Sequence, residues 1–172
     1  MGCPDRSIEK QNSGAAMMKN PKLAIEIIRA AKEGAGGLPV SVKTRIGFNK
    51  NELDTWITEL LKENLPALTV HLRTRKEMSL VPAHWDLMSE IIKLRDKISP
   101  QTLIIGNGDV IDLKDAKEKI KKYKCDGVML GRAIFGNPWL FAGGKPTIKE
   151  KLKVMVEHTK LFERMLGNPP AG

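Results

Sequence analysis

The 172-residue sequence has only two cysteines, Cys3 and Cys125, and no Cys-x-x-Cys pair. Two thiols are too few for a disulfide framework and lack zinc-site spacing, so we expect free thiols and no metal. The sequence also has no apolar run near the roughly 18 residues that a membrane helix needs. Its first residues lack the apolar core of a signal peptide. These absences predict a cytoplasmic protein with no membrane contact.

The charge is dominated by one sign, with 29 Lys and Arg against 20 Asp and Glu and a net charge of +9. Hydrophobic residues make up 41% and charged residues 28%, which is typical of a soluble globular protein. The length suffices for one domain with a buried core. A basic surplus of this size favours a polyanionic partner such as RNA, although many basic proteins bind no nucleic acid.

Short apolar strands alternate with amphipathic helices along most of the chain. We expect strands at 39–43, 67–71, 103–105 and 127–130, and helices at 22–33, 52–63, 84–97, 112–122 and 147–166. Asn20 and Pro21 are a favoured N-cap and first residue for the first of these helices. Four strand–helix units in series predict an α/β fold with a parallel sheet and right-handed crossovers.

Polar residues or glycines stand at or just after the carboxyl ends of the predicted strands: Lys43, His71, Asn107-Gly108-Asp109 and Gly131-Arg132. A (β/α) barrel and a doubly wound sheet both place their sites at this edge. A doubly wound sheet normally has a glycine-rich turn after its first strand, and the sequence has none there. We therefore predict a partial TIM (β/α)8 barrel of about four βα units, because a full barrel needs about 250 residues.

We expect residues 1–144 to form the partial barrel and residues 145–172 to begin a C-terminal helical domain. The opening Met1-Gly2-Cys3-Pro4 has the character of a strand end, so we interpret the chain as truncated at both ends. Half a barrel has two open sheet edges and an exposed core face. We therefore expect this chain alone to bind a cofactor weakly and to turn over little.

Two strand ends have the composition of a phosphate site. Glycine lets the backbone approach an anion and arginine binds phosphate bidentately, as Gly131-Arg132 and the preceding Asn107-Gly108-Asp109 would allow. On the same rim, Lys43 and His71 could stabilise the negative charge of a reduced flavin. Each signal is weak alone, since strand-end glycines are more often turns and single histidines more often structural.

Six sequence blocks strengthen this hypothesis because they stand in a fixed order. The blocks are 1–4 (MGCP) with 13–18 (SGAAMM), 42–47 (VKTRIG), 69–75 (TVHLRTR), 106–110 (GNGDV), 127–133 (GVMLGRA) and 136–141 (GNPWLF). In this order they resemble the tRNA-dihydrouridine synthase family. The resemblance implies an FMN-dependent enzyme in which NADPH reduces the flavin. Hydride then passes to C6 of a uridine that has been flipped out of its stack in tRNA.

The resemblance also implies roles for individual residues. Cys3 matches the catalytic acid that protonates C5 and so completes 5,6-dihydrouridine, and a thiol with an ordinary pKa near ~8.5 keeps its proton at neutral pH. The residues that match the family's FMN-binding positions are Lys43, His71, Asn107, Gly108, Asp109, Gly131 and Arg132. Arg73 matches a position that could contact flavin or RNA. Leu72 replaces the glycine usual between the histidine and this arginine, so the loop path is expected to differ.

Two other functions stay open. A related FMN-dependent barrel could reduce a free pyrimidine, and comparing tRNA with free uridine as electron acceptor would separate the two. A non-catalytic fragment could bind RNA or require a complementing amino-terminal half, and its mark would be tRNA binding without flavin. The lysine-rich segment 112–122 is interleaved with acidic residues, so we interpret it as a solvated outer face.

Overall fold

The computed structural model describes residues 1–167. The chain divides into two units, Met1–Phe135 and Gly136–Gly172. The helical segment expected to begin at residue 145 starts inside the second unit, and its residues 168–172 lie outside the described part. None of the described helices combines the length and the apolar character that crossing a membrane requires.

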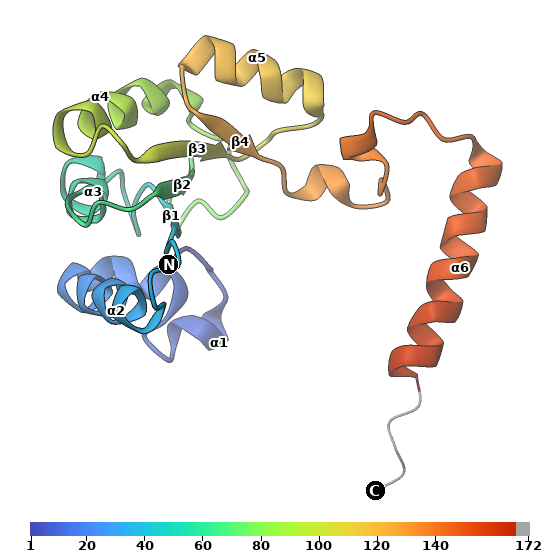
Figure 1. The fold of residues 1–172 in the computed structure, drawn as a ribbon, viewed down its shortest axis with the longest axis horizontal. Helices are drawn as coiled ribbons and strands as arrows, with labels where there is room; N and C mark the ends of the chain where they lie inside the picture. Colours follow the sequence, from blue (N-terminus) through green and yellow to red (C-terminus); the bar gives the residue numbers. More distant parts are fainter. Residues whose placement is uncertain (168–172) are drawn as a thin grey trace, which may run out of the picture. The chain divides into compact units, whose positions relative to one another are not determined.

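The first unit is built on a four-stranded parallel sheet with the order β1-β2-β3-β4. The strands are β1 (Val42–Arg45), β2 (Ala67–His71), β3 (Leu103–Asn107) and β4 (Gly127–Met129). The helices are α1 (Arg6–Glu9), η1 (Gly14–Lys19), α2 (Pro21–Gly34), η2 (Leu53–Ile57), α3 (Thr58–Lys62), η3 (Trp85–Leu87), α4 (Met88–Ile98), α5 (Leu113–Tyr123) and η4 (Arg132–Ile134). Helices α2, α3, α4 and α5 follow one another in an arc beside the strands (Figure 1).

The strand order confirms the predicted fold. Each described strand lies beside the next one in sequence, as in a (β/α) barrel, and the order does not reverse as it does in a doubly wound sheet. The sheet is therefore consistent with part of a TIM barrel made of four βα units. The predicted helices are present, with the second and third each divided between a short η segment and an α-helix.

The bounds of β1 correct the predicted strand at 39–43. The strand runs from Val42 to Arg45, because Pro39 has no N–H for a sheet hydrogen bond and pairing begins only at Val42, opposite Leu68. Lys43 therefore lies inside the strand, opposite Thr69, and Arg45 is the residue level with His71. Strand β3 is also longer than expected and includes Asn107.

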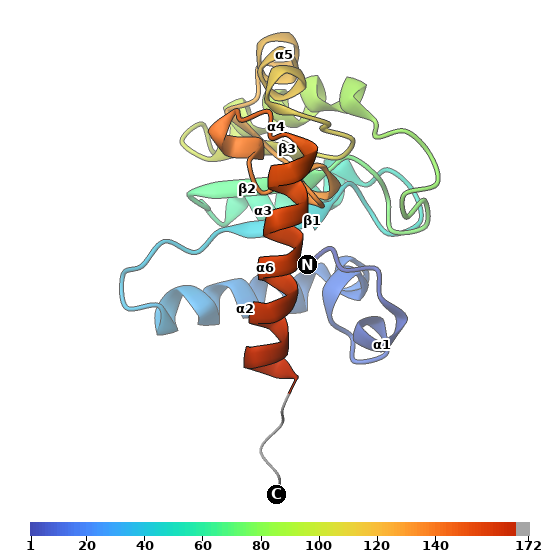
Figure 2. The same cartoon turned by 90° about the vertical axis from the view of Figure 1, so that its right-hand side faces the viewer.

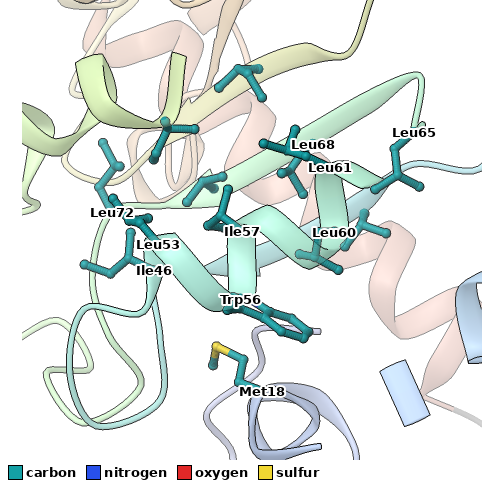
Figure 3. Packing of buried hydrophobic residues seen from close by; sticks show 14 of the residues in the cluster. Met18, Ile46, Leu53, Trp56, Ile57, Leu60, Leu61, Leu65, Leu68 and Leu72 are labelled. Carbon is teal, nitrogen blue, oxygen red and sulfur yellow. The ribbon is translucent and has the colours of Figure 1, made fainter. Parts of the chain in front are cut away.

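Alternation along the strands separates a packed face from the face that carries the polar residues. On the packed face, Val42, Thr44, Leu68, Val70 and Ile104 are all buried. The indole N–H of Trp56 donates to the Thr44 hydroxyl over 2.7 Å, so this face has no unpaired polar group at that point. Figure 3 shows Trp56 and its leucine and isoleucine neighbours gathered along η2 and α3 against the sheet.

Local capping explains where the long helices begin. The Asn20 side chain accepts from the N–H of Leu23, with Pro21 at the first position of α2 as predicted.

The second unit contains η5 (Leu140–Ala142) and α6 (Ile148–Leu166). Thr147 and Glu150 form a reciprocal capping box at the start of α6, which Figure 2 shows as a straight helix.

Candidate active site

A cavity of about 670 Å³ opens where β2, β3 and β4 end. Its lining consists of His71, Arg73, Ser79, Asn107, Gly108, Asp109, Val110, Ile111, Gly131, Arg132 and Ala133. Seven of the nine predicted site residues are in this set, and the other two, Lys43 and Cys3, are not. The carboxyl ends of parallel strands thus bring together residues that are up to 62 positions apart in the sequence, from His71 to Ala133.

The register places four residues in one row across the sheet. Arg45 is opposite His71, His71 is opposite Asn107, and Asn107 is opposite Met129. Lys43 lies on the same face as this row, two residues nearer the start of β1. Arg45 was not among the predicted site residues, although its spacing of two from Lys43 within a strand places both on one face.

Arg73 is the most buried cation of the site, with only 3% of its side chain exposed. Its guanidinium donates to Asp109 Oδ2 over 2.5 Å and to the Val81 carbonyl over 2.6 Å. Its third nitrogen lies 3.1 Å from His71 Nε2. The predicted contact of Arg73 with flavin or RNA stays a prediction: the residue lines the cavity, and its guanidinium nitrogens contact protein groups.

The Asp109 carboxylate accepts hydrogen bonds from three groups. Besides Arg73, its carboxylate accepts from the Ala83 N–H over 2.8 Å and from Arg132 over 3.2 Å. The Arg73 hydrogen bond is the largest cause that lowers the pKa of Asp109, so the group stays ionised at neutral pH. A carboxylate only accepts, so the Asp109 side chain orients the two arginines and does not itself donate a hydrogen bond to a phosphate.

The His71 ring is held neutral. Burial is the main cause that lowers its pKa to about 3, and the charges of Arg45, Lys43 and Arg73 add to it. Asp109 acts in the opposite direction and does not offset them. Gly108 makes room for this ring, because a Cβ there would stand 3.1 Å from His71 Cδ2 and 2.8 Å from the Ala83 Cβ.

The β4 side of the cavity can accommodate an anionic ligand. A Cβ on Gly131 would meet no atom within 4 Å, so space remains for a group to approach its backbone. The Arg132 side chain is 69% exposed, and its one side-chain hydrogen bond within residues 1–167 is to Asp109. The Asn107 amide donates to the Met129 carbonyl over 2.8 Å, which fixes that side chain across β3 and β4. This combination of open backbone and a free arginine edge fits a phosphate group such as that of FMN.

Cys3 lies on a loop beside β1, where its thiol is exposed. The Cys3 carbonyl accepts from the Ala15 N–H over 2.8 Å, and Gly14, with φ +61°, approaches so closely that a Cβ would lie 2.7 Å from that carbonyl. Arg45 holds the same loop by donating to the Gly2 carbonyl over 2.9 Å. Its other donors reach the carbonyls of Thr74 and Met78, each at 3.1 Å. Arg45 therefore joins the Cys3 loop to the loop after β2.

Lys43 contributes positive charge on the same face of the sheet. Desolvation of its ammonium is the main cause that lowers its pKa, and Arg45 adds to the shift, although much of the side chain remains solvent-accessible. Lys43 lies on the strand that pairs with β2, and its charge is one of the causes that lower the pKa of His71. Among residues 1–167, no cluster of His, Cys, Asp or Glu has the arrangement of a metal site.

Comparison with known proteins identifies the family of this chain. The family described as Dihydrouridine synthase (Dus) matches residues 1–169. A "Probable tRNA-dihydrouridine synthase" of Staphylococcus aureus (strain MRSA252) is 46% identical over 167 residues, which is 95% of this chain and 50% of that protein. The "Probable tRNA-dihydrouridine synthase 2" of Bacillus subtilis (strain 168) is 47% identical over 142 residues, covering 82% and 43% respectively. The chain thus spans about half the length of these relatives. It belongs to the dihydrouridine synthase family.

Proposed function

We propose that this protein carries the FMN-phosphate site and the acid of a tRNA-dihydrouridine synthase, with tRNA uridine as substrate and NADPH as reductant. The observation that supports this most is the convergence of His71, Asn107 and Arg132 on one cavity in a chain of this family. A net charge of +9 is compatible with a polyanionic substrate.

Each part of the site has a task in this proposal. Arg132 and the backbone at Gly131 and Gly108 would hold the phosphate of FMN, and Asn107 would border the ribityl chain. A bound FMN would supply hydride chemistry, from NADPH to C6 of the uridine. Lys43 would place positive charge beside the flavin ring, and His71 would offer a neutral imidazole to it.

Cys3 would provide the proton for C5 of the uridine. Its exposure leaves the thiol accessible to a base that has left its stack in tRNA. Arg45 would keep the thiol in place through the Gly2 carbonyl. Cys125 is a poor candidate for this step, because burial is the main cause that raises its pKa and its side chain is enclosed in the core.

The proposal is tested by incubating the protein with FMN, NADPH and unmodified tRNA and measuring dihydrouridine in the tRNA by mass spectrometry. We expect slow formation of dihydrouridine that is lost in Cys3→Ala and kept in Cys125→Ala, the matched control. Free uridine in place of tRNA should give no product. Equal reduction of free uridine, or unchanged product with Cys3→Ala, would contradict the proposal.

A further inference from the structure

Three side chains form a hydrogen-bonded chain at the carboxyl ends of β2 and β3. Arg73 stands in the middle, with His71 Nε2 at 3.1 Å on one side and Asp109 Oδ2 at 2.5 Å on the other. The third nitrogen of the guanidinium donates to the Val81 carbonyl over 2.6 Å. Because each nitrogen of Arg73 has a protein partner and only 3% of the side chain is exposed, Arg73 is directed into the protein.

Asp109 and His71, the two ends of this series of hydrogen bonds, are each held by neighbouring groups. Asp109 sits at φ +48°, held by the Ala83 N–H, and the Trp85 indole N–H donates to the Gly108 carbonyl over 2.8 Å from within the core. Gly108 lets the imidazole pack against the backbone. Arg73 therefore meets the His71 ring in a geometry that is fixed from two sides.

The direction of the Arg73–His71 hydrogen bond fixes the position of the histidine proton. An arginine at any accessible pH only donates, so His71 Nε2 must accept and must carry no proton. The proton of the neutral ring then lies on Nδ1, since the bond made by one ring nitrogen selects the tautomer. Within residues 1–167, no protein group is hydrogen-bonded to His71 Nδ1, while the ring lines the cavity.

We propose that Arg73 is a positioning residue that fixes His71 as the neutral Nδ1–H tautomer, which offers one oriented N–H donor to an acceptor atom of a ligand ring. Among residues 1–167, the charged groups that act on His71 are the cations Arg45, Lys43 and Arg73 and the carboxylate of Asp109. These charges disfavour an imidazolium, so the positive charge of the site comes from the arginines and the lysine. The identity of the ligand as a flavin rests on the proposed function, whereas the tautomer does not.

The experiment is a two-bond ¹⁵N–¹H correlation spectrum of the ligand-free protein labelled with ¹⁵N-histidine. The sequence has three histidines, and His71→Gln identifies the signal of His71. We expect a protonated Nδ1 and an unprotonated Nε2 that do not change between pH 7 and pH 5. An Nε2–H tautomer, or titration of His71 within that range, would overturn the proposal.

In the same spectrum, His84 serves as a reference with the opposite ring nitrogen protonated. His84 Nε2 lies 2.8 Å from the Glu77 carboxylate, which only accepts, so His84 should have a protonated Nε2. In Arg73→Met the His71 signal should change toward the Nε2–H form, and Asp109→Asn should keep the parent tautomer because Arg73 still donates. If Arg73→Met does not fold, the parent spectrum decides the tautomer and Arg73→Lys tests the donor.

Addition of FMN separates this inference from the proposed function. A shifted His71 Nδ1 signal with the expected tautomer supports both. The expected tautomer with no response to FMN would remove the flavin assignment and keep the role of Arg73. An Nε2–H tautomer that responds to FMN would keep the flavin site and reject the role of Arg73.

Discussion

The candidate site has two sides, one at the ends of β2, β3 and β4 and one beside β1, and different contacts hold them. On the β2–β4 side, His71, Arg73, Asp109 and Arg132 are joined to one another by side-chain hydrogen bonds. On the β1 side, the Cys3 loop is held by backbone contacts and by side chains that donate to its backbone carbonyls, Arg45 to Gly2 and Thr44 to Met1. The first side is suited to holding a ligand in a fixed place. The second leaves the thiol accessible, as the proposed role of Cys3 as a proton donor would require.

The largest expected effect is on the β2–β4 side, at Gly108. Gly108→Ala should lower the free energy of unfolding by about 2–4 kcal/mol, because a Cβ would be overpacked at a positive φ. Gly108 has φ +119°, and its Cβ would stand 2.8 Å from the Ala83 Cβ. Urea unfolding of the variant measures the change. Gly131→Ala, which has open space for its Cβ, is the matched control, and equal midpoints for the two variants would contradict the packing described.

The next effect concerns the β1 side. Arg45→Met should cost about 1–3 kcal/mol, because three carbonyls lose their donor, two of them on the loop after β2. Hydrogen exchange at the Ala15 amide, which donates to the Cys3 carbonyl, should become faster. Arg29→Met is the control, since Arg29 pairs with Glu63 at the surface and is remote from this loop. Unchanged Ala15 exchange in Arg45→Met would show that Arg45 does not hold the Cys3 loop.

The pH dependence of stability tests the neutral state of His71. Its pKa is lowered to about 3 in the folded protein, so the unfolded chain takes up a proton first as the pH falls below the ordinary histidine value. The contribution of His71 to the free energy of unfolding is therefore fully present above about pH 6.5. It falls by about 1 kcal/mol between pH 7 and pH 5.5. His71→Gln should remove that decrease, and His158→Gln, exposed on α6, should not. A decrease that persists in His71→Gln would contradict the assignment.

The smallest effect is expected on α5, away from both sides of the rim. Lys114 and Glu118 form an exposed ion pair at 3.9 Å, so Lys114→Ala should change stability by less than about 0.5 kcal/mol. The affinity for tRNA should also stay the same if the lysines of this helix are a solvated face. A marked loss of tRNA affinity in Lys114→Ala, measured at fixed salt, would make α5 part of an RNA surface.

Local patterns predicted much of the fold, and long-range pairing accounts for what they missed. The strand at Ala67–His71 and the helix after Asn20 follow from β-branched runs and capping residues. The β1 prediction began too early because Pro39-Val40 has the composition of a strand, although proline cannot pair in the sheet. The Arg73–Asp109 bond joins residues 36 positions apart, which no local pattern reveals. Arg45 was missed because the predicted strand ended at Lys43, so the alternation that places Arg45 on the same face was not followed to its end.

We propose that the cavity at the ends of β2, β3 and β4 binds the phosphate of FMN through Arg132. Equilibrium dialysis of FMN against the parent protein, Arg132→Ala and Lys114→Ala tests it most directly. Loss of a charge-assisted hydrogen bond should weaken binding about tenfold or more in Arg132→Ala, which is about 1.4 kcal/mol or more. Lys114→Ala should bind as the parent does. Equal affinity of all three proteins for FMN would contradict the claim.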